Sequence, residues 1–395
     1  MGGLAATLGA VGLTPFELAA QRGQRGAAAG GAAAKPDGPP KDPQVEYEKM
    51  AKLANNENPY GPSEAVMKAM NDAWKYANRY GYPDGGIRDA IAEHHGVKPE
   101  NIILAAGSGE ILKLVDDVYL PDHKIVVGMD PTYGSVYQYT TNSKAKAIKV
   151  ALKKDYTADI DAMIQETKLH SRDVGLVYLC NPNNPTGNIV NKADIKKLLN
   201  SIPEEIPVLI DEAYHHFVDN PNYETSIPYV LEGRRVIVAR TFSKIAALAG
   251  MRLGFAIAPK EMVGEMGPFA LSSISSVVKY GGVAALKDTA YEAKMKAMNK
   301  QLRDRTTAEL KQLGWETIPS DANFFMVNLK TDMGPIQTEF QKRNVLVGRR
   351  FSPMDNWLRV SVGSDDEMKR FVTVFKEIFP NGPDAKKPTT SAGGI

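Results

Sequence analysis

Short runs of strand character, most of them apolar and unbroken, recur through the middle of the chain, and stretches of helical character separate them. The runs cover residues 101–105, 124–127, 146–151, 174–180, 207–211, 236–239 and 255–258. A strand without polar alternation is buried on both faces, which is typical of parallel sheets that are covered by helices. The pattern therefore predicts an α/β fold with a parallel sheet at its centre.

The later part of the chain indicates a second, smaller domain. Residues 288–313 have the spacing of a long, charged, amphipathic helix, and apolar runs follow at 323–328, 345–347 and 358–362. A length of 395 residues also favours one large domain with a smaller one. We expect a leader, an N-terminal arm, a large α/β domain, an interdomain helix with a small α+β domain, and a tail, at 1–44, 45–60, 61–285, 286–380 and 381–395.

The two ends of the chain differ from the rest in composition. Residues 2–20 are small, apolar and uncharged up to Glu17, and residues 21–43 are rich in Ala, Gly and Pro. This start is similar to the apolar region of an export signal but lacks its positive charge. Two interpretations stay open: a truncated twin-arginine-type signal of a periplasmic protein, or a disordered leader with a cytoplasmic location as the default. The start is too weakly hydrophobic for a stable membrane span, and the tail is expected to be disordered.

The charge balance and the cysteine count exclude several classes of partner. A formal net charge of +2 does not provide the concentrated basic face that nucleic-acid binding needs. Cys180 is the only cysteine, which excludes an intrachain disulfide and a thiolate metal cluster. His215 and His216 follow two acidic residues, but adjacent side chains on a strand point to opposite faces. We therefore expect no nucleic-acid partner and no metal site.

One segment combines a lysine, two hydroxyls and an arginine between two expected strands. Lys244 follows Thr241 and Ser243, and Arg252 comes 8 positions later. The hydroxyls and the guanidinium can hold a phosphate dianion, while the lysine amine can form a Schiff base with an aldehyde. The segment thus fits a phosphate-bearing aldehyde cofactor, and an ordinary basic loop is the alternative.

Two further motifs follow the ends of apolar runs. Asn184 lies in residues 181–187 (Asn-Pro-Asn-Asn-Pro-Thr-Gly), directly after one run, and Asp211 ends the next run, 3 residues before Tyr214. Ligands in open α/β sheets bind at the carboxyl ends of strands. An amide, a carboxylate and the amine of Lys244 are thus expected at successive strand ends. The alternatives are a turn for the first motif and a helix N-cap for the aspartate.

Taken together, these motifs resemble the fold-type I pyridoxal-phosphate aminotransferases of classes I and II. The resemblance rests on 184–187 (Asn-Pro-Thr-Gly), 211–214 (Asp-Glu-Ala-Tyr), and Ser243 and Lys244 with Arg252. Within that family, residues 56–62 (Asn-Glu-Asn-Pro-Tyr-Gly-Pro) and 181–187 are similar to the histidinol-phosphate aminotransferase branch. The resemblance spans about residues 53–379. It implies a large domain with a mostly parallel seven-stranded sheet between helices, and a smaller α+β domain.

The resemblance implies a role for each of these groups. Lys244 would form the Schiff base with pyridoxal 5′-phosphate and then act as the base that moves the substrate proton. Asp211 would hold the pyridinium nitrogen, which makes the ring an electron sink. Asn184 and Tyr214 would bind the ring hydroxyl, and their hydrogen bonds would lower the pKa of the lysine–cofactor linkage. Asn184 would also face the substrate.

The same resemblance places other residues around the cofactor. The phosphate-binding group would consist of Gly107, Ser108, Gly109, Thr241, Ser243 and Arg252. A simple strand-to-helix turn is the alternative for the glycine-rich part of this group. Tyr133 would stack on the ring, with core packing as its alternative. Tyr60 would reach the cofactor phosphate of a neighbouring subunit, so the resemblance also implies a homodimer with shared active sites.

The resemblance assigns the substrate side to arginines. Arg359 matches the arginine that clamps the substrate's acid group, and a surface arginine on an edge strand is the alternative. The biosynthetic branch carries a second arginine directly after the strand at 345–347, where this chain has Gly348, followed by Arg349 and Arg350. One residue of offset in a strand reverses the face of a side chain. Arg349 is therefore expected to reach the pocket only through a bulge.

The expected reaction moves an amino group between an amino acid, or histidinol phosphate, and a 2-oxo acid such as 2-oxoglutarate. Amino-acid decarboxylation or another lyase reaction on the same fold is the alternative, because Lys244 and Asp211 serve either reaction. A cofactor-binding regulatory module would need an added DNA-binding segment, and the leader has neither the length nor the charge for one.

Overall fold

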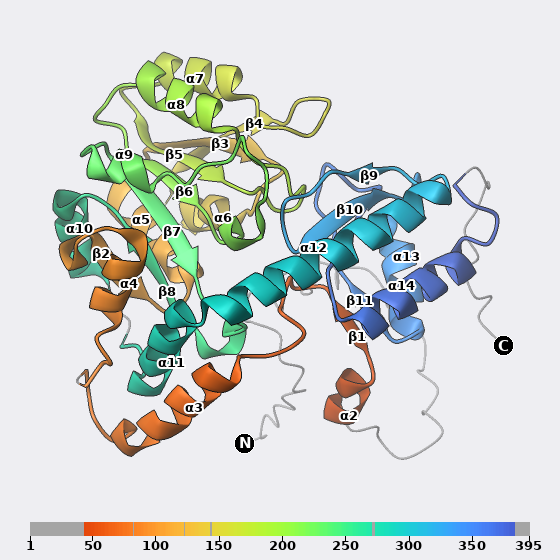
Figure 1. Cartoon of the computed structure of the whole chain (residues 1–395). Coiled ribbons are helices and arrows are strands. Elements are labelled where there is room, and N and C mark those ends of the chain that lie inside the picture. Colours follow the sequence, from red (N-terminus) through yellow and green to blue (C-terminus); the bar gives the residue numbers. More distant parts are fainter. Residues whose placement is uncertain (1–42, 82, 122, 143, 271–272, 384–395) are drawn as a thin grey trace, which may run out of the picture. The chain divides into compact units, whose positions relative to one another are not determined.

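A seven-stranded sheet carries the larger hydrophobic core in the computed structural model (Figure 1). The strand order is β2 (Ile102–Ala105), β8 (Gly254–Ile257), β7 (Val236–Thr241), β6 (Val208–Asp211), β5 (Val174–Cys180), β3 (Ile125–Asp130) and β4 (Lys146–Ala151). β8 is antiparallel to both of its neighbours, and all other neighbouring pairs are parallel. The mostly parallel seven-stranded sheet is therefore confirmed. The structure describes residues 43–81, 83–121, 123–142, 144–270 and 273–383.

Burial follows the position of each strand in this sheet. β6, β7 and β8 are buried at every residue, because helices cover both faces of the sheet at its centre. β4 lies at one edge, and most of its residues are exposed or half-buried. Lys146 and Lys149 on β4 suit this position, since charged side chains on an edge strand discourage pairing with another chain.

Helices connect the strands and cover the sheet. They are α3 (Glu64–Ala73), α4 (Ile87–His95), α5 (Ser108–Tyr119), α6 (Ser135–Asn142), α7 (Ile160–Leu169), α8 (Lys192–Ser201), α9 (Ile227–Leu231), α10 (Lys260–Met266) and α11 (Ser276–Lys287). Short 3₁₀ helices are η1 (Trp74–Tyr76), η2 (Pro99–Asn101), η3 (His215–Phe217), η4 (Ala249–Met251) and η5 (Gly267–Phe269). Ser63 caps α3 and Asp159 caps α7 by accepting a backbone N–H. α5 follows β2 almost directly, so its N-terminus lies at the edge where the parallel strands end.

A second hydrophobic core surrounds two smaller sheets. One is antiparallel, in the order β12 (Trp357–Ser361), β10 (Phe324–Asn328) and β9 (Thr317–Ile318). The other pairs β1 (Ala51–Leu53) with β11 (Val345–Val347) in parallel. The helices of this part are α12 (Thr289–Gln312), α13 (Met333–Lys342) and α14 (Asp365–Ile378). The described residues from Ala51 onward group as one unit, so the domain limits expected at 61–285 and 286–380 stay a prediction.

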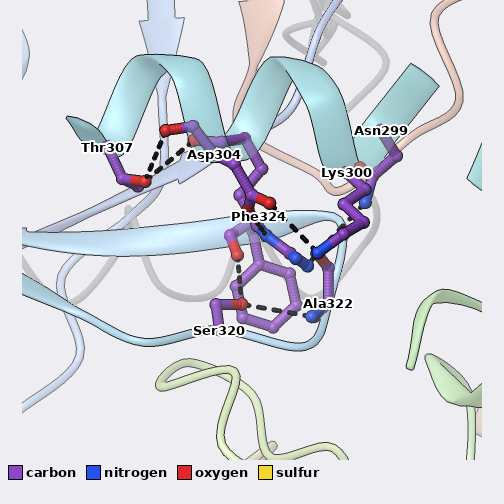
Figure 2. Close-up of polar contacts among 8 residues, drawn as sticks. Asn299, Lys300, Asp304, Thr307, Ser320, Ala322 and Phe324 are labelled. Carbon is purple, nitrogen blue, oxygen red and sulfur yellow. Dashed lines mark hydrogen bonds and ion pairs between the residues drawn. The ribbon is translucent and has the colours of Figure 1, made fainter. Parts of the chain in front are cut away.

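Helix α12 contacts η3 as well as β9, β10 and α14, and it holds the turn that precedes β10. Asn299 Nδ2 and Arg303 Nη1, both on α12, donate to the carbonyl of Ala322 over 3.3 and 3.0 Å. Within the turn, Ser320 Oγ accepts the N–H of Ala322 at 3.1 Å and donates to the carbonyl of Phe324 at 2.5 Å, as Figure 2 shows. These hydrogen bonds fix the backbone of the turn and thereby the position of Phe324, which contacts the candidate site described below.

The expected placement of His215 and His216 on a strand is wrong. Both lie in η3 rather than on a strand, and their ring centres are 3.6 Å apart. Faces do not alternate in a 3₁₀ helix as they do in a strand, so the two rings lie side by side. Burial lowers the pKa of both imidazoles well below the usual range, and both are therefore neutral. No group of three or more His, Cys, Asp and Glu side chains is arranged for a metal ion among the residues that the structure describes.

The expected leader and tail lie mainly outside the described residues, which begin at Pro43 and end at residue 383. The segment before Ala51 forms its own unit and contains α2 (Pro43–Glu48). Within the described ranges, the helices are all too short or too polar to span a membrane.

Candidate active site

Asn184, Asp211 and Lys244 share the carboxyl edge of the larger sheet. The strands that precede them, β5, β6 and β7, are direct neighbours in the sheet. Their ends are in register, because Cys180 pairs with Asp211, and Asp211 pairs with Ala239. The spacing of the motifs along the chain is thus converted into proximity at one edge.

The amine of Lys244 lies among polar groups and aromatic carbon. Its Nζ donates to the carbonyl of Asn55 at 3.1 Å and lies 5.5 Å from the centre of the Tyr214 ring. Burial, and after it the positive charge of Arg359, lowers the pKa of Lys244 to about 8. The neutral amine, which is the form that attacks an aldehyde, is therefore well populated at mildly basic pH.

Asp211 is a buried carboxyl group whose hydrogen-bond partner is a backbone amide. It is 2% exposed, and its Oδ1 accepts the N–H of Ala213 at 3.1 Å. Burial raises the pKa of Asp211 to about 7, and the Ala213 N–H and the charge of Lys244 offset that rise only in part. Its neighbour Glu212, by contrast, forms a buried ion pair with Arg240 at 2.6 Å. Asp211 forms no such ion pair within the described ranges, which leaves it available to a cationic group of a ligand.

The hydroxyl of Tyr214 lies where three segments of the chain meet. It accepts hydrogen bonds from Asn184 Nδ2 at 3.2 Å and from Asn56 Nδ2 at 3.1 Å. The ring packs edge-on against Phe324, with 5.0 Å between the ring centres. Burial raises the pKa of Tyr214, so the phenol keeps its proton. Asn56 belongs to the motif at residues 56–62, but its sequence pattern did not predict that it lies in the site.

Arg359 reaches the same cluster from β12. It is 6% exposed, and it donates from Nη1 to Asn184 Oδ1 at 2.7 Å and from Nη2 to the carbonyl of Ala54 at 2.5 Å. Its Nε is buried and has no protein partner among the described residues. Burial lowers the pKa of Arg359 to about 10. The alternative of a surface arginine is thus wrong, and a desolvated cation with an unused donor remains for an anionic ligand.

Arg349 and Arg350 have different surroundings. The guanidinium carbon of Arg349 lies 4.4 Å from the centre of the Phe351 ring, and that of Arg359 lies 4.7 Å from the same centre. Arg350 instead pairs with Asp332 and, at 3.6 Å, with another aspartate on the surface. Arg349 therefore shares an aromatic ring with Arg359, whereas Arg350 does not. Sequence reasoning missed Phe351, because nothing in its local pattern separates it from a core residue.

The expected phosphate site has the geometry of a tight cradle. Gly107 precedes α5 with a φ of 85°, and a Cβ there would lie 2.1 Å from Arg252 Nη2. A Cβ on Gly254 would lie 2.5 Å from Ser108 N, at the start of α5. Arg252 Nη2 also donates to the carbonyl of Ala106 at 3.0 Å. Glycine at positions 107 and 254 thus lets the Arg252 guanidinium lie close to the N-terminus of α5. A guanidinium beside a helix N-terminus can bind an anion.

The remaining residues expected to bind the cofactor differ in their exposure to solvent. Thr241 Oγ1 donates to Ser243 Oγ at 2.8 Å, and both residues are buried. Gly109 lies in the first turn of α5. Tyr133 is half-buried after β3. Tyr60 is 40% exposed, so its ring is accessible to another molecule.

The chain is similar to known proteins along most of its length. A family model described as "Aminotransferase class I and II" matches residues 48–375. The histidinol-phosphate aminotransferase of Moorella thermoacetica is 36% identical over 343 residues, which cover 84% of this chain and 86% of that protein. That of Caldicellulosiruptor saccharolyticus is 32% identical, with 85% and 94% covered. The fold matches the solved histidinol-phosphate aminotransferase of Sinorhizobium meliloti in complex with pyridoxal-5′-phosphate, with a TM-score of 0.75 at 23% identity and 84% and 91% covered.

Proposed function

The chain belongs to the class I and II aminotransferase family, and we propose that it transfers an amino group from an amino donor to a 2-oxo acid with pyridoxal 5′-phosphate as its cofactor. The observation that carries the proposal is the meeting of Lys244, Asp211, Asn184 and Tyr214 at one sheet edge, beside the buried Arg359. The relatives named above are aminotransferases, so the lyase alternative is not favoured.

Two features of the chain fit this cofactor. Asp211 is a buried carboxyl group without an ion-pair partner within the described ranges, as a cationic ring nitrogen would require. The cradle of Gly107, Ser108 and Arg252 would hold the phosphate, with Thr241 and Ser243 nearby. When bound, the ring supplies an electron sink for the negative charge that develops at the donor Cα.

The side chains divide the work of the reaction. Lys244 would hold the cofactor through its amine, and once the donor's amine has displaced it, the same amine would move a proton at the donor Cα. A pKa of about 8 suits an amine that must lose and regain a proton near neutral pH. Asn184 and Tyr214 would donate to the ring oxygen, and Tyr133 would cover the ring. Arg359 would hold the donor's acid group and so orient its Cα.

The identity of the amino donor depends on the part of the site that would bind the donor's anionic group, here called the anion side, which contains Arg349 and Arg359. The relatives named above are histidinol-phosphate aminotransferases, and we propose histidinol phosphate as the first candidate donor. Two guanidinium groups on one Phe351 ring, those of Arg349 and Arg359, offer more positive charge than a single carboxylate requires. Aromatic and other amino acids, whose anionic handle is a carboxylate, remain the competing class.

We further propose a homodimer in which Tyr60 of one subunit completes the phosphate site of the other. The exposure of Tyr60 in the single chain supports this proposal. Sedimentation of the wild-type protein would give the oligomeric state. A Tyr60→Phe variant should then bind the cofactor less tightly, and unchanged affinity would remove Tyr60 from the site.

The experiment that tests the function is a donor panel. The purified protein is loaded with pyridoxal 5′-phosphate, and each donor is added with 2-oxoglutarate. Transamination should bleach the visible absorbance of the bound cofactor with the donor alone, restore it with the acceptor, and yield glutamate. Release of an amine and carbon dioxide without this bleaching would overturn the proposal in favour of a lyase.

A further inference from the structure

Asn56 is a buried residue beside Tyr214 of the candidate site. It is 1% exposed and has a φ of 55°, a left-handed conformation that asparagine tolerates better than most residues. Its backbone carbonyl accepts from Asn323 Nδ2 at 2.9 Å, and its side chain contacts Tyr214 and Ser361. All of its polar groups are therefore used, in a place where an unsatisfied group would cost free energy.

The contact with Ser361 determines which way the Asn56 amide points. Ser361 Oγ accepts the backbone N–H of Asn56 at 2.8 Å. The hydroxyl of Ser361 also donates its own proton to Asn56 Oδ1, which lies 2.8 Å away. With Oδ1 engaged as an acceptor, the NH₂ group of Asn56 must face Tyr214.

The second amide at Tyr214 is oriented in a similar way. Arg359 has no acceptor atom, so it can only donate to Asn184 Oδ1, and the NH₂ group of Asn184 must then face Tyr214. The phenol oxygen therefore receives two N–H groups. Its acceptor capacity is filled, and the proton that it carries has to be given to a third group.

We propose that Asn56 is a positioning residue that makes Tyr214 a hydrogen-bond donor to the ring oxygen of the cofactor. The inference rests on the proposed function, in which Tyr214 faces that oxygen. Asn56 itself does not need to touch the cofactor. It acts through Tyr214, and Ser361 acts through Asn56. In this chain of hydrogen bonds, Ser361 donates to Asn56 and Asn56 donates to Tyr214.

The direction of this chain has a measurable consequence. A donated hydrogen bond favours the ionised ring oxygen, and this lowers the pKa of the lysine–cofactor linkage that the visible absorbance reports. If Tyr214 were turned to donate elsewhere, that pKa would rise. A purely structural role for Asn56 would change the stability of the protein but would leave this spectroscopic pKa in place.

Asn56→Asp is the sharpest test, because it keeps the shape of the side chain and replaces the NH₂ donor with an acceptor. Tyr214 would donate to the new carboxylate, and we expect the spectroscopic pKa to rise by about one pH unit, a tenfold change in the equilibrium. The added negative charge also raises this pKa without involving Tyr214. The same substitution in a Tyr214→Phe background measures that charge effect alone.

Ser361→Ala provides a variant without a change of charge. It releases the Asn56 amide to turn over, and we expect a smaller rise of the spectroscopic pKa that disappears in the Tyr214→Phe background. This variant keeps the inference testable if Asn56→Asp does not fold. Equal shifts in the two backgrounds, or no shift in either variant, would overturn the inference. Absence of a Lys244-dependent visible band in the wild-type protein would overturn the proposed function instead.

Discussion

The cofactor side and the anion side of the candidate site are built in different ways. The cofactor side consists of groups that follow adjacent strands of one sheet: Asn184, Asp211 and Lys244. The anion side consists of Arg359 on β12 and Arg349 after β11, which belong to different sheets and meet at the ring of Phe351. Strand pairing within one sheet aligns the first group. The second group joins two sheets, where the N–H of Gly348 donates to the carbonyl of Arg359 at 2.9 Å and both guanidinium groups pack on Phe351.

A change of register by one residue has different structural consequences on the two sides. Gly348 stands where an arginine was expected, and a Cβ at this position would lie 2.7 Å from the carbonyl oxygen of Arg359. No side chain fits there, and the arginine whose guanidinium lies on Phe351 is Arg349, one residue later. A similar shift at Asp211 would turn the carboxylate to the other face of the sheet.

The largest effect is expected on the cofactor side, from Lys244→Ala. The variant loses both the Schiff base and the proton-transfer group, so turnover should fall by about 10⁴-fold or more. Absorbance after reconstitution and single-turnover assays would measure both losses. Lys260→Ala is a matched control, because Lys260 is an exposed lysine 3.7 Å from Glu100. A Lys244→Ala protein that still forms the lysine-linked visible band would remove Lys244 from its role.

Arg359→Ala removes the buried arginine of the anion side. Removing one partner of a desolvated ion pair costs about 3–5 kcal/mol, so kcat/KM for acidic donors should fall by more than about a hundredfold. Cofactor binding should change much less, which separates the two sides of the site. Arg305→Ala, at an exposed ion pair with Asp365, is the control. Wild-type kcat/KM in Arg359→Ala would contradict the assignment.

Arg349→Ala sharpens the comparison within the anion side. We expect a loss of about 10- to 100-fold in kcat/KM for histidinol phosphate, since a hydrogen bond to a charged group contributes about 1.5–3 kcal/mol. Donors with only a carboxylate should be affected less. Arg350→Ala should leave both donor classes unchanged, because Arg350 pairs with Asp332 on the surface. If Arg350→Ala gave the larger loss, the assignment of Arg349 would be wrong.

The smallest effect concerns pH and the cofactor side. The folded pKa of Lys244 is lowered to about 8, so the neutral amine increases as pH rises through that value. The rate at which the cofactor-free protein captures pyridoxal 5′-phosphate should therefore rise about tenfold between pH 7 and pH 9. Stopped-flow absorbance would measure this rate. A continued increase up to pH 10 would show an ordinary lysine instead.

The sequence predicted the strands of the larger sheet well because their apolar runs are continuous. Parallel order follows from that pattern, and so does the carboxyl edge at which Asp211 and Lys244 lie. The same reasoning failed at His215, which the apolar run before it led us to place on a strand. The η3 helix there depends on hydrogen bonds that follow the end of β6, such as that from the N–H of His215 to the carbonyl of Glu212.

The sequence by itself determined the family and the mostly parallel sheet. Its motif spacing also placed Asn184, Asp211 and Lys244 at successive strand ends, because backbone pairing brings such ends to one edge. Only the tertiary structure decided that Asn56 contacts Tyr214 and that Arg349, rather than Arg350, shares Phe351 with Arg359. These contacts join segments as far apart in the chain as residues 56 and 361. A local sequence pattern cannot predict these contacts, since long-range packing and the directions of buried hydrogen bonds arise only in the folded chain.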